Sequence, residues 1–184
     1  MKIEIFDTTL RDGFQQEGIS PSVKDKIEIA KLIDELGVAY IEGGWPGASP
    51  KEEEFFETAK NELKLKNAKL VSFGSTRKLN TRVEEDSQVA ALINAGTDYV
   101  CIVGKTSKLH ITKALQTDVE NAISMAVDTV KYLKVNNKKV FLTGDICKVS
   151  KGKYYFLNRK DRQIKLFGNR IELNEIDCII GDIF

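Results

Sequence analysis

The sequence predicts an α/β fold built on a parallel sheet, with a small antiparallel appendage at its end. Up to about residue 141, short apolar runs alternate with stretches whose apolar residues recur at helical spacing. Such alternation implies crossover connections and parallel strands. Beyond that point, apolar and polar residues alternate over short runs on either side of turn residues, which is typical of β-hairpins.

The first part of the chain is expected to hold strands and helices in strict alternation. The strands are expected at Ile3–Phe6, Val38–Glu42, Ala68–Phe73, Asp98–Val103 and Lys139–Leu142. The helices are expected at Ser22–Leu36, Pro50–Leu63, Glu84–Asn94 and Thr117–Leu133. Periodicity alone does not decide whether such a series closes as a barrel or stays open.

Capping residues justify these helices in order. The candidate N-caps are Ser20 or Ser22 for the first helix, Ser49 for the second, and Thr117 or Asp118 for the fourth. Pro50 suits the first helical position, and the acids that follow it suit the first turn. Gly37 and Gly96 end the first and third helices.

The last part of the chain is expected to form two hairpins and a short helix. The first hairpin joins Ile146–Val149 to Lys153–Leu157, and the second joins Gln163–Phe167 to Arg170–Leu173. Asn174 can cap a helical stretch at Glu175–Ile180.

Composition and charge exclude several classes of protein. Twenty-eight Lys and Arg against 27 Asp and Glu give a net charge of +1, without the basic excess of a nucleic-acid or membrane-surface binder. No apolar run approaches the roughly 18 residues of a membrane span. The chain opens on an amphipathic strand instead of a signal peptide, and its three cysteines lack paired spacing. A cytoplasmic protein with reduced thiols is expected.

The loop Asp7–Gly18, directly after the first strand, is the densest group of candidate functional residues. Loops at the carboxyl ends of parallel strands build active sites. Carboxylates suit a hard cation such as Mg²⁺ or Mn²⁺, and an adjacent Arg can hold a carboxylate or a developing oxyanion. From composition alone, a turn with solvated charges is an equal alternative.

Several segments in order resemble the metal-dependent Claisen-condensing enzymes and their lyase relatives, and the citramalate synthase branch in particular. They are Asp7–Gly18, Tyr40–Gly47, Glu52–Phe56, Ser72–Arg77, and Gly104–Ser107 with His110. The resemblance covers residues 1 to about 141. It implies a (β/α)8 barrel, a divalent metal (Mg, Mn or Zn), and condensation of acetyl-CoA with a 2-keto acid, pyruvate for citramalate synthase.

The resemblance also implies roles for single residues. Asp12 maps onto a metal ligand, and Arg11 onto a catalytic residue that stabilises the enolate and keto oxygens. Glu42 maps onto an active-site acid, either supporting the metal site or taking part in proton transfer. Gln15, Arg77, Thr106 and His110 fall where the family binds substrate, while Trp45 and Pro46 either shape the pocket wall or simply pack.

The chain departs from the family pattern near Phe141, in the fifth strand. A complete (β/α)8 barrel needs about 250 residues, whereas this chain has 184. The family's metal-binding His-x-His pair is absent. About four and a half βα units of a partial barrel are therefore expected, with an incomplete active site.

Residues from about 142 onward resemble a second family, the adenylate-forming enzymes. The segments Thr143–Asp145 and Tyr155–Asp177 resemble the hinge region of that family, which binds AMP or ATP. The resemblance implies nucleotide contacts at Asp145, Arg159 and Lys165, and a hinge at Asp161.

Three interpretations follow for the whole chain. The first is a citramalate synthase-like acyltransferase that is weakly active or inactive, and the second is a fragment of an adenylate-forming ligase. The third is a non-catalytic product of two joined genes. The expected partners are small molecules, with neither nucleic acid nor membrane, and a homodimer could bury the open edges of a half-barrel.

Overall fold

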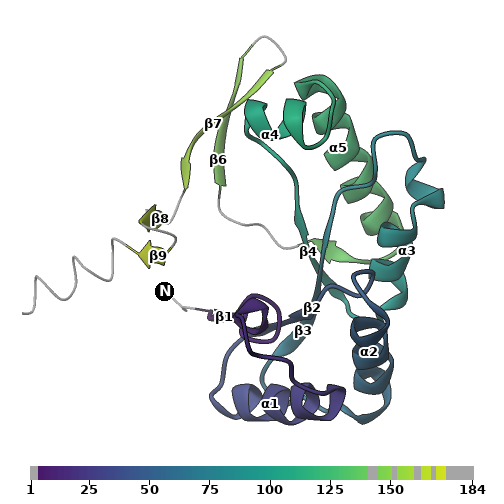
Figure 1. The fold of residues 1–184 in the computed structure, drawn as a ribbon, viewed down its shortest axis with the longest axis vertical. Coiled ribbons are helices and arrows are strands. Elements are labelled where there is room, and N and C mark those ends of the chain that lie inside the picture. Colours follow the sequence, from purple (N-terminus) through teal and green to yellow (C-terminus); the bar gives the residue numbers. More distant parts are fainter. Residues whose placement is uncertain (1–3, 141–144, 151–152, 160–162, 167–168, 173–184) are drawn as a thin grey trace, which may run out of the picture. The chain divides into compact units, whose positions relative to one another are not determined.

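The computed structural model describes residues 4–140, 145–150, 153–159, 163–166 and 169–172. The chain divides into two compact units, Met1–Phe141 and Leu142–Phe184. In the first unit, five strands form a parallel sheet in the order β1-β2-β3-β4-β5 (Figure 1). The predicted parallel α/β arrangement is therefore confirmed.

Each strand lies close to its predicted position. The strands are β1 (Phe6–Asp7), β2 (Tyr40–Gly44), β3 (Lys69–Ser75), β4 (Tyr99–Val103) and β5 (Lys139–Val140). The helices between them are α1 (Val23–Glu35), α2 (Pro50–Glu62), α3 (Ser87–Asn94), α4 (Lys108–Lys113) and α5 (Val119–Val135). Two 3-10 turns lie at Gly13–Gln15 and Val83–Glu85.

The helices differ from the prediction in two places. The third helix begins at Ser87 instead of Glu84, because the Asp86 carboxylate caps it by accepting the N–H groups of Gln88 and Val89. The short helix α4 was not expected at all. Of the alternative caps, Ser22 starts α1, where it forms a complete capping box with Asp25, and Asp118 starts α5.

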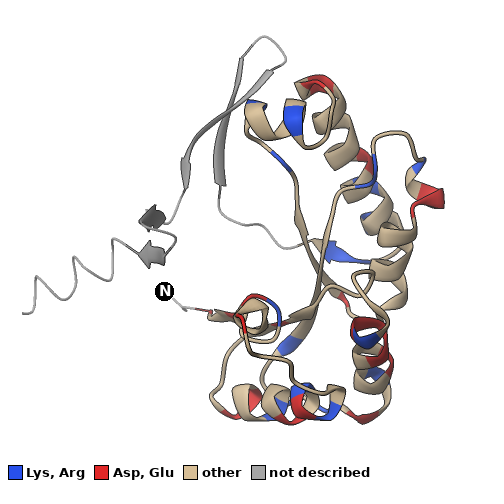
Figure 2. Ribbon diagram, in the orientation of Figure 1, with Lys and Arg blue, Asp and Glu red and all other residues tan. Residues whose placement is uncertain are grey.

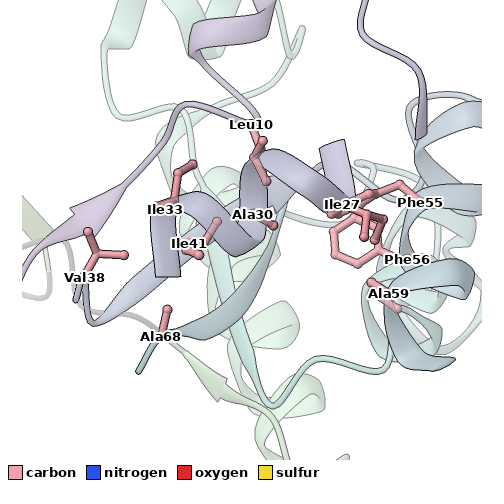
Figure 3. Close-up of a cluster of buried hydrophobic side chains, with 11 residues drawn as sticks. Leu10, Ile27, Ala30, Ile33, Val38, Ile41, Phe55, Phe56, Ala59 and Ala68 are labelled. Atoms are coloured by element: carbon pink, nitrogen blue, oxygen red, sulfur yellow. The ribbon is translucent and has the colours of Figure 1, made fainter. Parts of the chain in front are cut away.

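Helices α1, α2, α3 and α5 lie on the same side of the sheet (Figure 1), and two apolar clusters fill the space between. The larger cluster, drawn in Figure 3, packs α1 and α2 against β2 and includes Ile27, Ile41, Phe55 and Phe56. The smaller one joins Val89, Leu92, Val100 and Leu133. Burying a side chain as large as Phe55 stabilises the fold by about 3 kcal/mol.

The opposite face of the sheet carries the remaining strand residues, because successive side chains of a strand alternate between its two faces. We call this the inner face. It presents Tyr40 and Glu42 from β2, Phe73 from β3, and Tyr99 and Cys101 from β4. Charges of both signs are spread over the outer helices α1 and α2 (Figure 2).

The second unit contains two antiparallel strand pairs. Strand β6 (Asp145–Ser150) pairs with β7 (Lys153–Arg159), and β8 (Gln163–Leu166) pairs with β9 (Asn169–Glu172). The helix expected at Glu175–Ile180 lies outside the described residues. Within the described part of the chain, no helix is both long and apolar enough to cross a membrane.

Candidate active site

The site is built at the carboxyl ends of the parallel strands, and the loop after β1 supplies its first residues. The Asp7 carboxylate accepts hydrogen bonds from the backbone N–H and the hydroxyl of Thr9, both at 3.0 Å, which starts a tight turn. The Thr8 carbonyl then accepts the N–H groups of Arg11, Asp12 and Gly13 at 2.8–3.2 Å. This turn directs Arg11 over the sheet.

Arg11 lies among three partners at the carboxyl ends of β1, β2 and β3. Its Nε donates to Glu42 Oε2 at 2.6 Å and its Nη1 to Asp12 Oδ1 at 2.9 Å. Its guanidinium carbon lies 4.3 Å from the centre of the Phe73 ring. Glu42 is 1% exposed, so its charge requires this cation. Charge and stacking together fix the guanidinium.

Cys101 on β4 faces the same group. Strands β2 and β4 are alternate strands, whose inward side chains share a layer in barrels of this kind. Burial raises the pKa of the Cys101 thiol to about 12, and the negative charge of Glu42 and a hydrogen bond to it act in the same direction. The thiol is therefore protonated at neutral pH.

The Trp45 indole is held beside the site by two contacts. Its ring meets Phe73 edge to face, with 5.6 Å between centroids. Its Nε1 donates to Gln88 Oε1 at 2.6 Å, and Gln88 Nε2 donates to the Gly47 carbonyl at 2.7 Å. Trp45 thus buttresses the ring on which Arg11 lies.

The structure brings together three of the residues predicted from the sequence, Arg11, Asp12 and Glu42. Gln15 lies nearby on the 3-10 turn and is exposed. Thr106 and His110 follow β4 and are also exposed. Within residues 4–140, no hydrogen bond joins either side chain to Arg11 or Glu42.

Arg77, predicted to bind substrate, is occupied by structural contacts. Its Nε and Nη2 donate to Asp128 Oδ2 at 3.0 and 2.8 Å, and its Nη1 donates to three nearby carbonyl oxygens. It lines a hollow of about 740 Å³ between the loop after β3 and α5, and Arg11 is not among the lining residues. Its geometry supports anchoring of this loop.

Sequence reasoning did not single out Phe73 and Gln88, which contact Arg11 and Trp45, or Glu52, which accepts the Trp45 N–H and pairs with Lys26 of the outer layer. Of these, Lys26 carried a detectable signal. Lys26 falls on the apolar stripe of the first helix, three residues after Val23 and four before Ala30, where a buried residue is expected. The contacts of the other three lie between elements, and local periodicity does not report them.

The residues in hand do not make up a complete metal site. No group of three or more His, Cys, Asp and Glu suited to a metal ion occurs among the described residues. The Asp12 carboxylate is 65% exposed and provides one oxygen ligand of the kind that Mg²⁺ or Mn²⁺ prefers. Both Asp7 oxygens accept hydrogen bonds from Thr9. Metal binding by Asp12 therefore stays a prediction.

The parallel sheet has helices on one side and an Arg–Asp pair after its first strand. These features describe a partial (β/α) barrel with a candidate site at the carboxyl ends of its strands. The HMGL-like family profile matches residues 2–156, so the chain belongs to the HMGL-like family. This confirms the resemblance of the first part, and the match extends past the boundary expected near residue 141.

Among curated relatives, the chain is similar to proteins named citramalate synthase and isopropylmalate synthase. It is 54% identical over 133 residues to (R)-citramalate synthase of Aquifex aeolicus, covering 72% of this chain and 25% of that one. It is 46% identical to (R)-citramalate synthase of Streptomyces coelicolor, covering 75% and 26%. It is 36% identical to 2-isopropylmalate synthase of Lysinibacillus sphaericus, covering 72% and 25%. The chain spans about a quarter of the length of these relatives.

Solved structures show the same fold. The chain matches the HMG-CoA lyase of Bacillus subtilis with a TM-score of 0.58 and 17% identity, covering 76% of this chain and 45% of the other. For hydroxymethylglutaryl-CoA lyase of Pseudomonas aeruginosa the TM-score is 0.59 and the identity 18%, covering 76% and 44%. The expected partial (β/α)8 barrel is confirmed.

The second resemblance, to adenylate-forming enzymes, stays a prediction. Asp145, Arg159 and Lys165 lie on β6, β7 and β8, and Asp161 lies outside the described residues. No contact to a nucleotide is assigned to them.

Proposed function

We propose that this chain carries the 2-keto-acid-binding part of an acyltransferase that condenses acetyl-CoA with pyruvate to give citramalate. The names of the relatives that are 46–54% identical support the reaction. The observation that carries the proposal is the guanidinium of Arg11, fixed by buried Glu42 and by Phe73 at the carboxyl ends of the strands.

The geometry of Arg11 suits an oxygen-rich ligand. Its Nε and Nη1 bind Glu42 and Asp12, while its Nη2 has no hydrogen-bond partner among the described residues. That nitrogen can donate to the carboxylate or keto oxygen of the substrate. In the condensation, an acetyl carbanion attacks the keto carbon and negative charge develops on the keto oxygen, where a fixed cation is most effective.

For Glu42 the sequence left open support of the metal site or a part in proton transfer, and the geometry supports a third role, orientation of Arg11. Its Oε2 accepts from Arg11 Nε at 2.6 Å, and the side chain is almost wholly buried. A general base must reach the proton that it removes. We therefore assign Glu42 to positioning the guanidinium. Binding of the keto acid is assigned to this chain, and full turnover to a site with further ligands.

The test uses Trp45, the single tryptophan, as a reporter beside the site. Its fluorescence is titrated with pyruvate in the presence of MnCl₂, with acetate as the ligand that lacks a keto group. A saturable change is expected with pyruvate. Arg11→Lys keeps a cation beside Glu42 but loses the forked donor, and is expected to weaken binding about tenfold.

Arg82→Lys, at an exposed arginine with one loose ion pair, is the matched control. Equal titrations for wild type and Arg11→Lys would overturn the proposal, as would the absence of any pyruvate response. The second result would favour the non-catalytic interpretation. Release of CoA from acetyl-CoA, measured with a thiol reagent, reports whether the chain turns over.

A further inference from the structure

A lysine is buried in the outer layer of the barrel, where the proposed reaction makes no use of it. Lys26 on α1 is 2% exposed and lies within the apolar stripe of the helix. Its Nζ donates to Glu52 Oε1 at 2.8 Å and lies 4.4 Å from the centre of the Phe55 ring. Glu52 belongs to the first turn of α2.

Stability does not explain this pair. Removing two charges from water costs several kcal/mol per ion, and apolar residues of similar volume commonly stabilise such a site equally well. Burial lowers the pKa of Lys26, which reflects that cost. Lys26 is buried and Glu52 is 22% exposed, and a pair kept with one charge out of water points to a role in positioning.

The second oxygen of Glu52 shows what that role is. Glu52 Oε2 accepts the backbone N–H of Trp45 at 3.2 Å, at the carboxyl end of β2. A Cβ at Gly44 would lie 1.8 Å from the same oxygen, so the carboxylate lies directly against this backbone. Glu52 thus ties the start of α2 to the loop that carries Trp45.

A comparison of two helix starts supports this reading. Ser22 and Asp25 of α1, and Ser49 and Glu52 of α2, have the same capping-box spacing. In α1 the Asp25 carboxylate returns to the Ser22 N–H at 2.8 Å and closes the box. In α2 the Ser49 hydroxyl accepts the Glu52 N–H, but the Glu52 carboxylate goes to Lys26 and Trp45 instead. The Glu52 carboxylate therefore leaves the capping box of α2 open and binds the backbone beside the site instead.

From Trp45 the contacts continue to the reacting group. The indole meets the Phe73 ring edge to face, and the guanidinium carbon of Arg11 lies 4.3 Å from the centre of that ring. We infer that Glu52, held by Lys26, is a positioning residue that sets Trp45 and, through Phe73, the place of Arg11. The importance of this place for binding rests on the proposed function, but the positional claim does not.

The test compares two double variants that differ in one acceptor oxygen. Lys26→Met with Glu52→Gln removes the charge pair and keeps an amide oxygen that can accept the Trp45 N–H. Lys26→Met with Glu52→Met removes the acceptor as well. Glu54→Gln, an exposed residue of the same helix, is the control. All are measured without ligand.

Two signals report position: the fluorescence anisotropy decay of Trp45 and the hydrogen exchange of Arg11 Nε–H followed by ¹⁵N NMR. The Met/Gln variant is expected to resemble wild type. The Met/Met variant is expected to show a freer indole and exchange about tenfold faster, at an unfolding midpoint equal to or above that of Met/Gln. A purely structural pair would give both doubles the same signals.

Identical signals in the two double variants would therefore overturn the inference. So would a Met/Met variant that fails to fold, because the pair would then be structurally irreplaceable. Pyruvate titration with MnCl₂ is the separate arm, where Met/Met is expected to bind about tenfold more weakly than Met/Gln. If wild type does not bind pyruvate, the proposed function fails while the positional signals still decide the inference.

Discussion

The two ends of the inner face use the same pair of groups, a cation beside an aromatic ring, in different ways. At the carboxyl ends of the strands, Arg11 lies over Phe73 and binds Glu42, which is 1% exposed. At the amino ends, Lys69 lies 5.0 Å from the ring centre of Tyr99, and its Nζ donates to the Tyr99 hydroxyl at 3.1 Å. Lys69 is exposed.

The difference lies in the buried counter-charge. Water can replace any partner of an exposed ammonium group, so the amino-end contact fixes little. A carboxylate out of water cannot lose its cation without a large penalty, so Glu42 holds Arg11 in one place. Of the two ends, only the carboxyl end therefore has the fixed geometry that a binding site requires.

The largest expected effect comes from removing the cation at the carboxyl end. Arg11→Met leaves the carboxylate of Glu42 buried without a cation, and is expected to destabilise the fold by about 3 kcal/mol in urea unfolding. Lys139→Met removes an exposed lysine near Tyr99 at the amino end and serves as the control. A loss below about 1 kcal/mol for Arg11→Met would mean that the contact at the carboxyl end is as weak as the exposed contact at the amino end.

A smaller effect is expected at Gly44, beside the Glu52 carboxylate. Its φ of +144° is unfavourable for other residues, and a Cβ would meet Glu52 Oε2 at 1.8 Å. Gly44→Ala is expected to cost about 2 kcal/mol. Gly18→Ala is the control, because Gly18 also has positive φ but a Cβ there would meet no atom within 4 Å. Equal losses at both positions would mean that only backbone strain acts at Gly44.

The reactivity of the Cys101 thiol tests the buried contact with Glu42 at the same end of the sheet. Its pKa of about 12 leaves about 1,000-fold less thiolate than at the ordinary value near 9, so alkylation by iodoacetamide should be slow at pH 8. Cys147→Ser and Cys178→Ser remove the other thiols, and Glu42→Gln is expected to speed the reaction. A rate like that of a free thiol would contradict the buried contact.

The same pKa has a consequence for stability. Because the pKa is raised in the folded state, the folded protein holds this proton more tightly than the unfolded chain does. The contribution is fully present below about pH 9 and is lost as pH rises toward 12. Urea unfolding of wild type and Cys101→Ser between these values measures it.

The sequence predicted most of the fold because strands and long helices carry their own periodic pattern. It failed where the pattern was short or ambiguous. The six residues of α4 give too few turns for a periodic pattern. Helix α3 begins after its N-cap Asp86, and not at Glu84 as predicted. Residue spacing sets the elements, whereas the side-chain cap sets where they begin.

The site was predicted in part for a comparable reason. The family resemblance implied that Arg11 and Glu42 belong to one site, and parallel strands bring their carboxyl ends together, but neither gave the contact between them. The path from Lys26 through Glu52 to Trp45 crosses three elements. Its side chains meet only after the helices have packed, and local sequence does not encode such contacts.

The smallest expected effect lies at the amino end and sharpens the comparison from the other side. The hydrogen bond from Lys69 lowers the pKa of Tyr99. Lys69→Met should therefore raise that pKa, measured by NMR titration of the tyrosine ring, and leave the unfolding midpoint unchanged because both groups are solvated. A clear fall in the midpoint would show that the amino end is held as firmly as the carboxyl end. An unchanged pKa would instead mean that the Lys69–Tyr99 contact does not persist in solution, while the pair of Arg11 and buried Glu42 remains fixed.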